Sequence, residues 1–392
     1  MKSILKWVLR GGLAMVVLAL ALGIWQREKI TRLMAVNSLF AEDRIVGNFI
    51  SMDSLFETAP LTTSQTPNRL ARGTDMAMPP GFATWAQDRA VTGIVVLKDG
   101  NIRHESYPLT AEGETDPATS HRISWSVAKS FLSVLVGILV EDGSIESLDD
   151  PVVKYAPALA RSAYANATLR DVLQMSSGVT FDEDYLDFNS DINRMGRILA
   201  LGGAMDGFAA GLQDTFTAPG TDWRYVSIDT HVVGMVVRGA TGRTIPDLLS
   251  EKVITPLGLT QTPYYITDGY GVAFVLGGLN LTTRDYALFG HMIASGGMSF
   301  GTRIVSEDWI TQSTRASAPT NAGEIGYGYQ WWVPVGATDG QFMARGIYGQ
   351  YIYIDRPRGV VIAVNAADRQ FREDGVNEQN IAMFRAIAEA LD

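Results

Sequence analysis

The chain has 392 residues, of which 46% are hydrophobic and 19% charged, and it contains no cysteine. Its formal net charge of −10 argues against nucleic acid as a partner, because binding a polyanion requires a basic surface. The lack of cysteine excludes disulfides, a thiolate nucleophile and cysteine metal sites.

Residues 1–30 have the pattern of an export or anchor segment, in which basic residues precede the apolar run GGLAMVVLALALGIW at 11–25. With the apolar residues around Trp7, this run approaches the ~20 residues that span a bilayer. Small residues at 19–21 fit a signal-peptide cleavage site only loosely, because the apolar run continues past them. We favour an uncleaved anchor over a signal peptide, and we expect a bacterial inner-membrane protein with its main domain in the periplasm.

The remaining chain is predicted to form a connecting segment at 31–60 and one domain at 61–392. Strand patterns near both ends of the chain enclose a helix-rich middle. We therefore expect an α/β part formed by about 61–125 and 265–392, with a helical part at about 126–264. The expected elements are a hairpin at 92–108, apolar helices at 126–142, 231–243 and 284–297, two antiparallel strands within 342–366 joined at RPRG, and a closing helix at 377–392.

The segment SWSVAKSF, residues 124–131, places Ser126 and Lys129 one turn apart at the start of a helix that is apolar on every face. Burial disfavours the ammonium form and would leave a neutral amine able to take the serine proton. The alternative is a structural lysine whose stem is buried and whose charged head reaches water.

Ser-x-x-Lys is the nucleophile motif of β-lactamases and penicillin-binding proteins. A Tyr-x-Ser motif follows at Tyr225–Ser227, and a Gly-containing strand motif follows at Ala344–Gly346. The chain resembles the class C-like branch of this superfamily of serine hydrolases, closest in pattern to 6-aminohexanoate-dimer hydrolase and related esterases. The resemblance implies a β-lactamase/transpeptidase-like α/β fold, with an antiparallel sheet from both chain ends flanked by helices and an all-helical insertion.

The resemblance also implies roles for individual residues. Lys129 and Tyr225 would share a proton relay that serves Ser126, although Tyr225 could instead be a buried structural tyrosine. The backbone N–H groups of Ser126 and Ile347 would form the oxyanion hole. The implied substrate-binding residues are Tyr185, Ser227 and Gly346.

The third motif departs from the family pattern, because Ala344 occupies the position of a cation that holds a β-lactam carboxylate. Alternation along a strand places Arg345 on the opposite face. The acidic stretch at 182–187 is more typical of a solvated loop than of a cation site, and we expect neither metal nor cofactor.

The segment GMSFG at 297–301 imitates the nucleophile elbow of α/β-hydrolases, but no histidine follows Ser299, so we expect a hairpin turn there. The predicted function is a serine hydrolase that cleaves a small-molecule ester or linear amide. The alternatives are a β-lactamase or D,D-peptidase and, in another class, a catalytically inactive binding module. The oligomeric state stays open.

Overall fold

The computed structural model describes residues 6–7, 9–13, 15–18 and 26–392. Within these ranges, no helix combines the length and apolar character needed to cross a membrane. The predicted anchor can be compared only in part, because the small residues at 19–21 and Trp25 lie outside the described residues. Trp7 lies within them and is 70% exposed.

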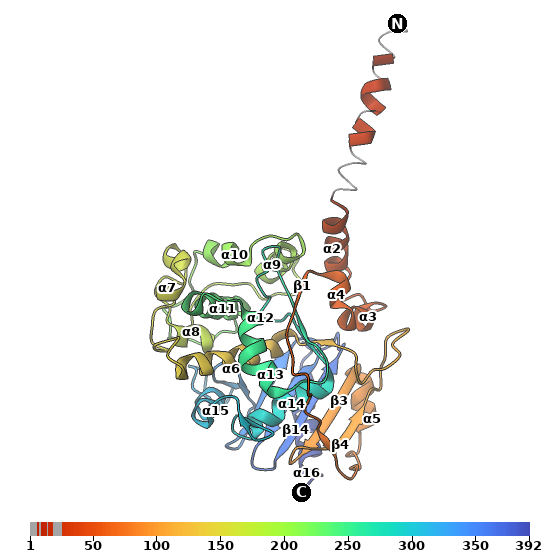
Figure 1. Cartoon of the computed structure of the whole chain (residues 1–392), viewed down its shortest axis with the longest axis vertical. Helices are drawn as coiled ribbons and strands as arrows, with labels where there is room; N and C mark the ends of the chain where they lie inside the picture. The colour runs from red at the N-terminus through yellow and green to blue at the C-terminus, as the bar shows by residue number, and fades with distance from the viewer. Residues whose placement is uncertain (1–5, 8, 14, 19–25) are drawn as a thin grey trace.

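An eight-stranded sheet built from both ends of the chain forms the centre of the fold (Figure 1). Its strand order is β10-β11-β12-β13-β14-β3-β4-β2, and β14 pairs with β3, with Ala363 opposite Val95. The pairs are antiparallel except β2 with β4, which run parallel, so the sheet is mixed at one edge. The strands are β2 (Ala71–Arg72), β3 (Val91–Lys98), β4 (Asn101–Ser106), β10 (Gly326–Tyr327), β11 (Trp332–Val333), β12 (Gln341–Gly346), β13 (Gln350–Asp355) and β14 (Val360–Ala366).

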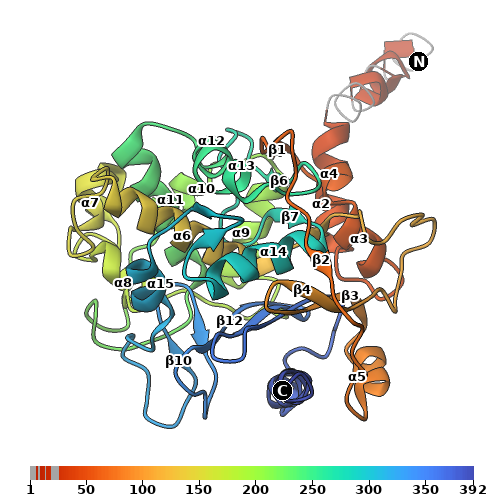
Figure 2. The same ribbon diagram turned by 60° about the horizontal axis from the view of Figure 1, so that its bottom comes forward.

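Helices cover both faces of this sheet (Figure 2). On one face, Trp85 and Phe384 meet edge to face with their ring centroids 5.9 Å apart. On the other face, the rings of Phe131 and Phe289 stack with their centroids 3.6 Å apart, so a second layer of helix packs on the helix that covers the sheet. The helices involved are α5 (Phe82–Asp88) and α16 (Val376–Glu389) on the first face, and α14 (Thr283–Ala294) with α6 (Ala128–Glu141) beyond it on the second.

The helix α6 is buried on nearly every side, as its sequence predicts, and it ends before Gly143, whose φ of +78° suits a helix C′ position. The middle of the chain forms a series of helices. They are α7 (Val152–Tyr155), η2 (Pro157–Arg161), α8 (Leu169–Leu173), α9 (Asp191–Ala200), α10 (Met205–Gly211), α11 (Ser227–Thr241), α12 (Ile245–Leu249), η3 (Ser250–Ile254) and α13 (Thr255–Leu257). Of these, α11, α12 and η3 contact α6. The division of the chain into domains stays a prediction.

A smaller sheet, in the order β1-β6-β7-β5, leads the chain into α6. The amino-terminal helices pack nearby, α3 against β5 and α2 against α9. These elements are α2 (Arg27–Asn37), α3 (Ile45–Ile50), α4 (Met52–Leu55), β1 (Thr58–Pro60), β5 (Arg122–Ile123), β6 (Tyr264–Ile266) and β7 (Leu279–Leu281).

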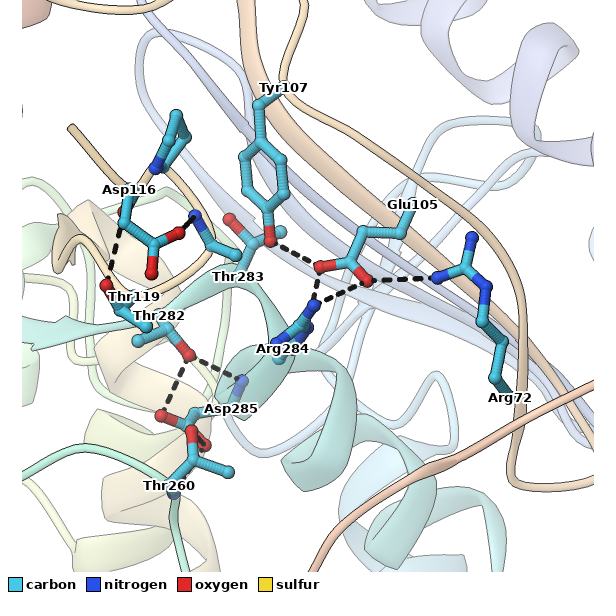
Figure 3. Close-up of polar contacts among 12 residues, drawn as sticks. Arg72, Glu105, Tyr107, Asp116, Thr119, Thr260, Thr282, Thr283, Arg284 and Asp285 are labelled. Atoms are coloured by element: carbon cyan, nitrogen blue, oxygen red, sulfur yellow. Dashed lines mark hydrogen bonds and ion pairs between the residues drawn. The ribbon is translucent and has the colours of Figure 1, made fainter. Parts of the chain in front are cut away.

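A buried carboxylate fixes the edge of the large sheet to α14 (Figure 3). Glu105 of β4, whose side chain is only 5% exposed, accepts two hydrogen bonds from Arg284, at 2.6 and 3.0 Å, and one from the Tyr107 hydroxyl at 2.7 Å. Arg72 of β2 approaches the same carboxylate at 3.5 Å. The cluster links β4, α14 and β2. Its arginines and the Tyr107 hydroxyl stabilise the charged form of a carboxylate that burial alone would disfavour.

The carboxyl-terminal strand region differs from its prediction. Residues 341–366 form three strands rather than two, because an additional tight turn at Tyr348 and Gly349, with φ of +58° and +84°, separates β12 from β13. The segment at 297–301 does form the expected hairpin, with β8 (Met298–Ser299) paired to β9 (Thr302–Arg303). The helix α15 (Glu307–Thr314) follows it.

Candidate active site

Ser126 lies in a short 3-10 turn, η1 (Trp125–Val127), between β5 and α6. The turn begins with a strained residue, since Trp125 has a φ of +41°. The Trp125 ring is held by Phe40 and Phe49 of the amino-terminal segment, with ring centroids 5.6 and 5.5 Å away. Strain at this point presents Ser126 at the amino-terminal end of α6, where free N–H groups and the helix dipole favour negative charge.

Lys129 lies within the protein and does not extend to water, since it is only 2% exposed. Its Nζ donates to the Thr230 hydroxyl at 3.1 Å and to the Ser227 carbonyl at 3.3 Å. Burial lowers the pKa of Lys129 to about 7, although the carboxylates of Glu183 and Asp229 act in the opposite direction. A large share of the side chain is therefore the neutral amine at neutral pH.

The hydrogen-bond partners of Lys129 act as acceptors towards its amine. The Thr230 hydroxyl donates to Gln330 at 2.8 Å, so towards Lys129 it acts as the acceptor. Gln330 is itself fixed by donating to the Leu173 carbonyl at 2.8 Å. A neutral amine has two hydrogens, and Thr230 and Ser227 accept both, which leaves the lone pair free to accept another hydrogen.

Tyr225 lies two residues before the start of α11, and its ring stacks on Trp332 with centroids 5.1 Å apart. The Lys129 Nζ lies 5.2 Å from the centre of the same ring. Burial and the charge of Glu183 raise the pKa of Tyr225, against the effect of the hydroxyls of Ser126 and Ser227. Tyr225 is therefore a neutral phenol with a proton to donate.

Glu183 is a site residue that sequence analysis missed. It turns inward from the acidic stretch, where it accepts a hydrogen bond from the Ser227 backbone N–H and others from the Ser227 hydroxyl at 3.2 Å and the Tyr185 hydroxyl at 2.9 Å. Burial raises the pKa of Glu183, and Lys129 opposes that shift. In the described part of the chain, no group of three or more His, Cys, Asp or Glu residues could hold a metal ion.

Asp229 is a second buried carboxylate that the sequence did not indicate. Its Oδ1 accepts from the Tyr164 hydroxyl at 2.7 Å and the Ser177 hydroxyl at 2.8 Å, while its Oδ2 has no partner among the described residues. Burial raises the pKa of Asp229 to about 7. The nearby Lys129 thus faces acids whose own charge is also disfavoured.

The end of β12 passes directly against the backbone of Ser126. A Cβ at Gly346 would lie 2.8 Å from the Ser124 carbonyl oxygen and 3.0 Å from the Ser126 nitrogen, so only glycine allows this approach. Ile347 follows at the start of the tight turn and borders the same cavity as Ser126. The two residues expected to form the oxyanion hole therefore border the same cavity.

Arg345 lies on the predicted face of its strand, but its side chain still reaches the cavity of Ser126. Ala344 faces the helical core and is fully buried, and Arg345 is on the opposite face of β12 as predicted. Its guanidinium lies 5.3 Å from the Trp332 ring centre, yet the side chain also lines the cavity of Ser126. The cavity reaches round the end of the strand towards α16, so facing away from Ala344 does not remove this cation from the site.

The cavity at Ser126 has a volume of about 460 Å³. It brings together five of the predicted residues, whereas Lys129 and Ser227 are buried beneath it. The five are Ser126, Tyr185, Tyr225, Gly346 and Ile347. Charged side chains of the segment before α16, among them Arg372 and Glu373, line its outer part.

The chain is similar in sequence to known proteins. The sequence profile described as "Beta-lactamase" matches residues 82–384. A 6-aminohexanoate-dimer hydrolase of Paenarthrobacter ureafaciens is 30% identical over 256 residues, which are 62% of this chain and 65% of the relative, so the chain spans just under two thirds of that relative's length.

Solved structures share the fold. A Bacillus anthracis protein provisionally assigned as a 6-aminohexanoate-dimer hydrolase has a TM-score of 0.76 and 20% identity, over 90% of this chain and 96% of its own. A family VIII carboxylesterase has a TM-score of 0.59 and 18% identity, over 81% of this chain and 99% of its own.

Proposed function

Because the chain belongs to the β-lactamase family, which confirms the resemblance and the fold class predicted from its motifs, we propose that it is a serine hydrolase cleaving an ester or a linear amide. The observation that carries the proposal is the fully buried Lys129, held by Thr230 and Ser227 with its lone pair available, one turn from Ser126. A buried lysine one helical turn from a serine that lines a cavity is the arrangement expected of a base and its nucleophile.

In the proposed reaction the amine of Lys129 takes the Ser126 proton as the serine oxygen bonds to the carbonyl carbon. The charge that develops on the carbonyl oxygen is held by the N–H groups of Ser126 and Ile347. When the bond to the leaving group breaks, Tyr225 gives its proton to the departing atom and regains one from the Lys129 ammonium. Water then attacks the acyl-enzyme by the same route and releases the acid.

Tyr185 has a narrower role in this proposal. Its hydroxyl proton is used in the hydrogen bond to Glu183, so towards a substrate the oxygen acts as an acceptor. An amide N–H in the cavity can donate to it, whereas an ester has no such hydrogen. Tyr185 is therefore proposed to bind amide substrates in particular.

A fluorophosphonate probe tests the proposal directly, because it bonds only to an activated serine. We expect the full chain to be labelled, Ser126→Ala to show no labelling and no hydrolysis, and Lys129→Ala to lose most of both. The control is Ser54→Ala, at an exposed serine of α4. Labelling that persists in folded Ser126→Ala would overturn the assignment, and an unlabelled wild-type protein would favour the inactive binding module.

A β-lactamase or D,D-peptidase is the second candidate, favoured by the presence of Arg345 in the cavity, where it could pair with a carboxylate. We still expect hydrolysis of p-nitrophenyl butyrate to exceed that of nitrocefin, because the family's own cation position is the apolar Ala344. Residues 1–30 are further proposed to anchor the protein in a bacterial inner membrane with its catalytic domain in the periplasm. Fractionation with sequencing of the mature amino terminus tests this, and a soluble form starting near residue 22 would contradict it.

A further inference from the structure

A second cavity meets the first at Ser126. It has a volume of about 90 Å³, it is more enclosed, and its lining is mostly apolar. Ser126, Tyr185 and Ile347 line both cavities. We propose that this closed cavity binds the acyl chain of the substrate, a short unbranched apolar chain; the inference rests on the proposed hydrolase function.

The walls of the closed cavity come from distant parts of the sequence. One wall is α9, with Met195, Gly196 and Leu199. The opposite wall is the amino-terminal segment, including Leu39 and Phe40. Asn193 and Ser227 also line this cavity, but most of its lining is apolar, so it offers an alkyl chain dispersion contacts and exclusion from water, which suits an acyl chain.

The position of Tyr225 decides which half of the substrate enters which cavity. Tyr225 lines the open cavity and not the closed one. The leaving atom must lie next to the proton donor, and the leaving group must depart before water can enter, so the leaving group occupies the open, charged cavity. The acyl group stays bonded to Ser126, and the remaining apolar space beside that residue is the closed cavity.

The volume sets the length of the chain. An apolar cavity of ~150 Å³ holds benzene, which has six carbons, so the same proportion gives the closed cavity room for about four carbons beyond the carbonyl. Each methylene that enters improves kcat/KM about fourfold. For p-nitrophenyl esters we therefore expect kcat/KM to be about fifteenfold higher for butyrate than for acetate, to peak at butyrate or hexanoate, and to fall at octanoate.

Gly196 allows a direct test. A Cβ built on this helical residue would meet no described atom within 4 Å, so a larger side chain can enter the cavity without displacing backbone. The leucine side chain of Gly196→Leu has four carbons, the number of acyl carbons expected to fit. We expect this variant to lower the butyrate-to-acetate ratio of kcat/KM about tenfold.

The matched control is Gly207→Leu, in the adjacent helix α10, where the residue is exposed and a Cβ would meet only the Ala204 Cβ at 3.8 Å. This variant should keep the wild-type ratio. Leu199→Ala, which enlarges the cavity, should move the optimum to longer chains and serves as the second variant if Gly196→Leu does not fold.

The outcomes separate this inference from the proposed function. A protein that is labelled by fluorophosphonate and hydrolyses esters, but whose ratio is the same in wild type, Gly196→Leu and Leu199→Ala, would overturn the acyl cavity alone. A wild-type protein that is neither labelled nor active on any ester of the series would overturn the proposed function and the acyl cavity with it.

Discussion

The close approach of Gly346 to the nucleophile's backbone makes Gly346→Ala a sensitive probe of the oxyanion hole. The added methyl group would lie 2.8 Å from the Ser124 oxygen and 3.0 Å from the Ser126 nitrogen, where ordinary contacts begin at 3.4 Å. Both atoms belong to the backbone and cannot rotate away, so β12 and η1 must separate by about half an ångström.

A separation of about half an ångström is large compared with the range of distances over which an oxyanion hole works. Oxyanion donors act at about 2.7–3.1 Å, and loss of one costs a factor of about 10² to 10³ in kcat, or roughly 2.7–4 kcal/mol of transition-state stabilisation. We expect a fall in kcat of that order on p-nitrophenyl butyrate, with KM changed much less because the ground-state ester is not charged.

The assay combines steady-state kinetics with thermal unfolding, so that loss of activity is measured on folded protein. Gly47→Ala in α3 is the control, because a Cβ there would meet no described atom within 4 Å, and it should keep wild-type kcat. A folded Gly346→Ala protein with kcat within threefold of wild type would refute the assignment of this contact to the oxyanion hole.

Two further predictions concern the proton relay and the substrate. Lys129 must be neutral to act as a base, and burial lowers its pKa to about 7. We therefore expect kcat/KM for an ester to rise about tenfold per pH unit below pH 7 and to level off above it. A flat or falling pH–rate profile between pH 5 and 8, measured on protein whose fold is unchanged by circular dichroism, would contradict this role. Tyr185→Phe should lower turnover of a linear amide about tenfold more than turnover of the matching ester, since only the amide N–H can donate to the lost hydroxyl oxygen, and an equal loss on both substrates would contradict it.

The candidate nucleophile and its proposed relay could be singled out because they lie in short local patterns. Ser126 and Lys129 are one helical turn apart, and Tyr225 lies two residues before the start of helix α11. A spacing within one turn survives any arrangement of the rest of the chain, so it can be recognised without knowing the fold.

Glu183 and Arg345 show what local patterns lack. Asp182, Glu183 and Asp184 look alike in the sequence, and only the long-range contact with Ser227 distinguishes the middle one. Alternation correctly gives the strand face of Arg345, but whether a cavity continues round the strand end depends on how α16 packs, which no spacing encodes.

The pairing of β3 with β14 has a consequence for how the protein matures. The centre of the large sheet can form only after residues 360–366 have been synthesised and have paired with residues 91–98. Gly346, at the end of β12, is also synthesised late and only then can contact the backbone of Ser126. Contacts between such distant residues slow folding, because a long loop must be ordered first. On the ribosome, a chain lacking its last strands would expose the apolar face of β3, so such nascent chains depend on protection from aggregation and should show no hydrolytic activity until synthesis is nearly finished.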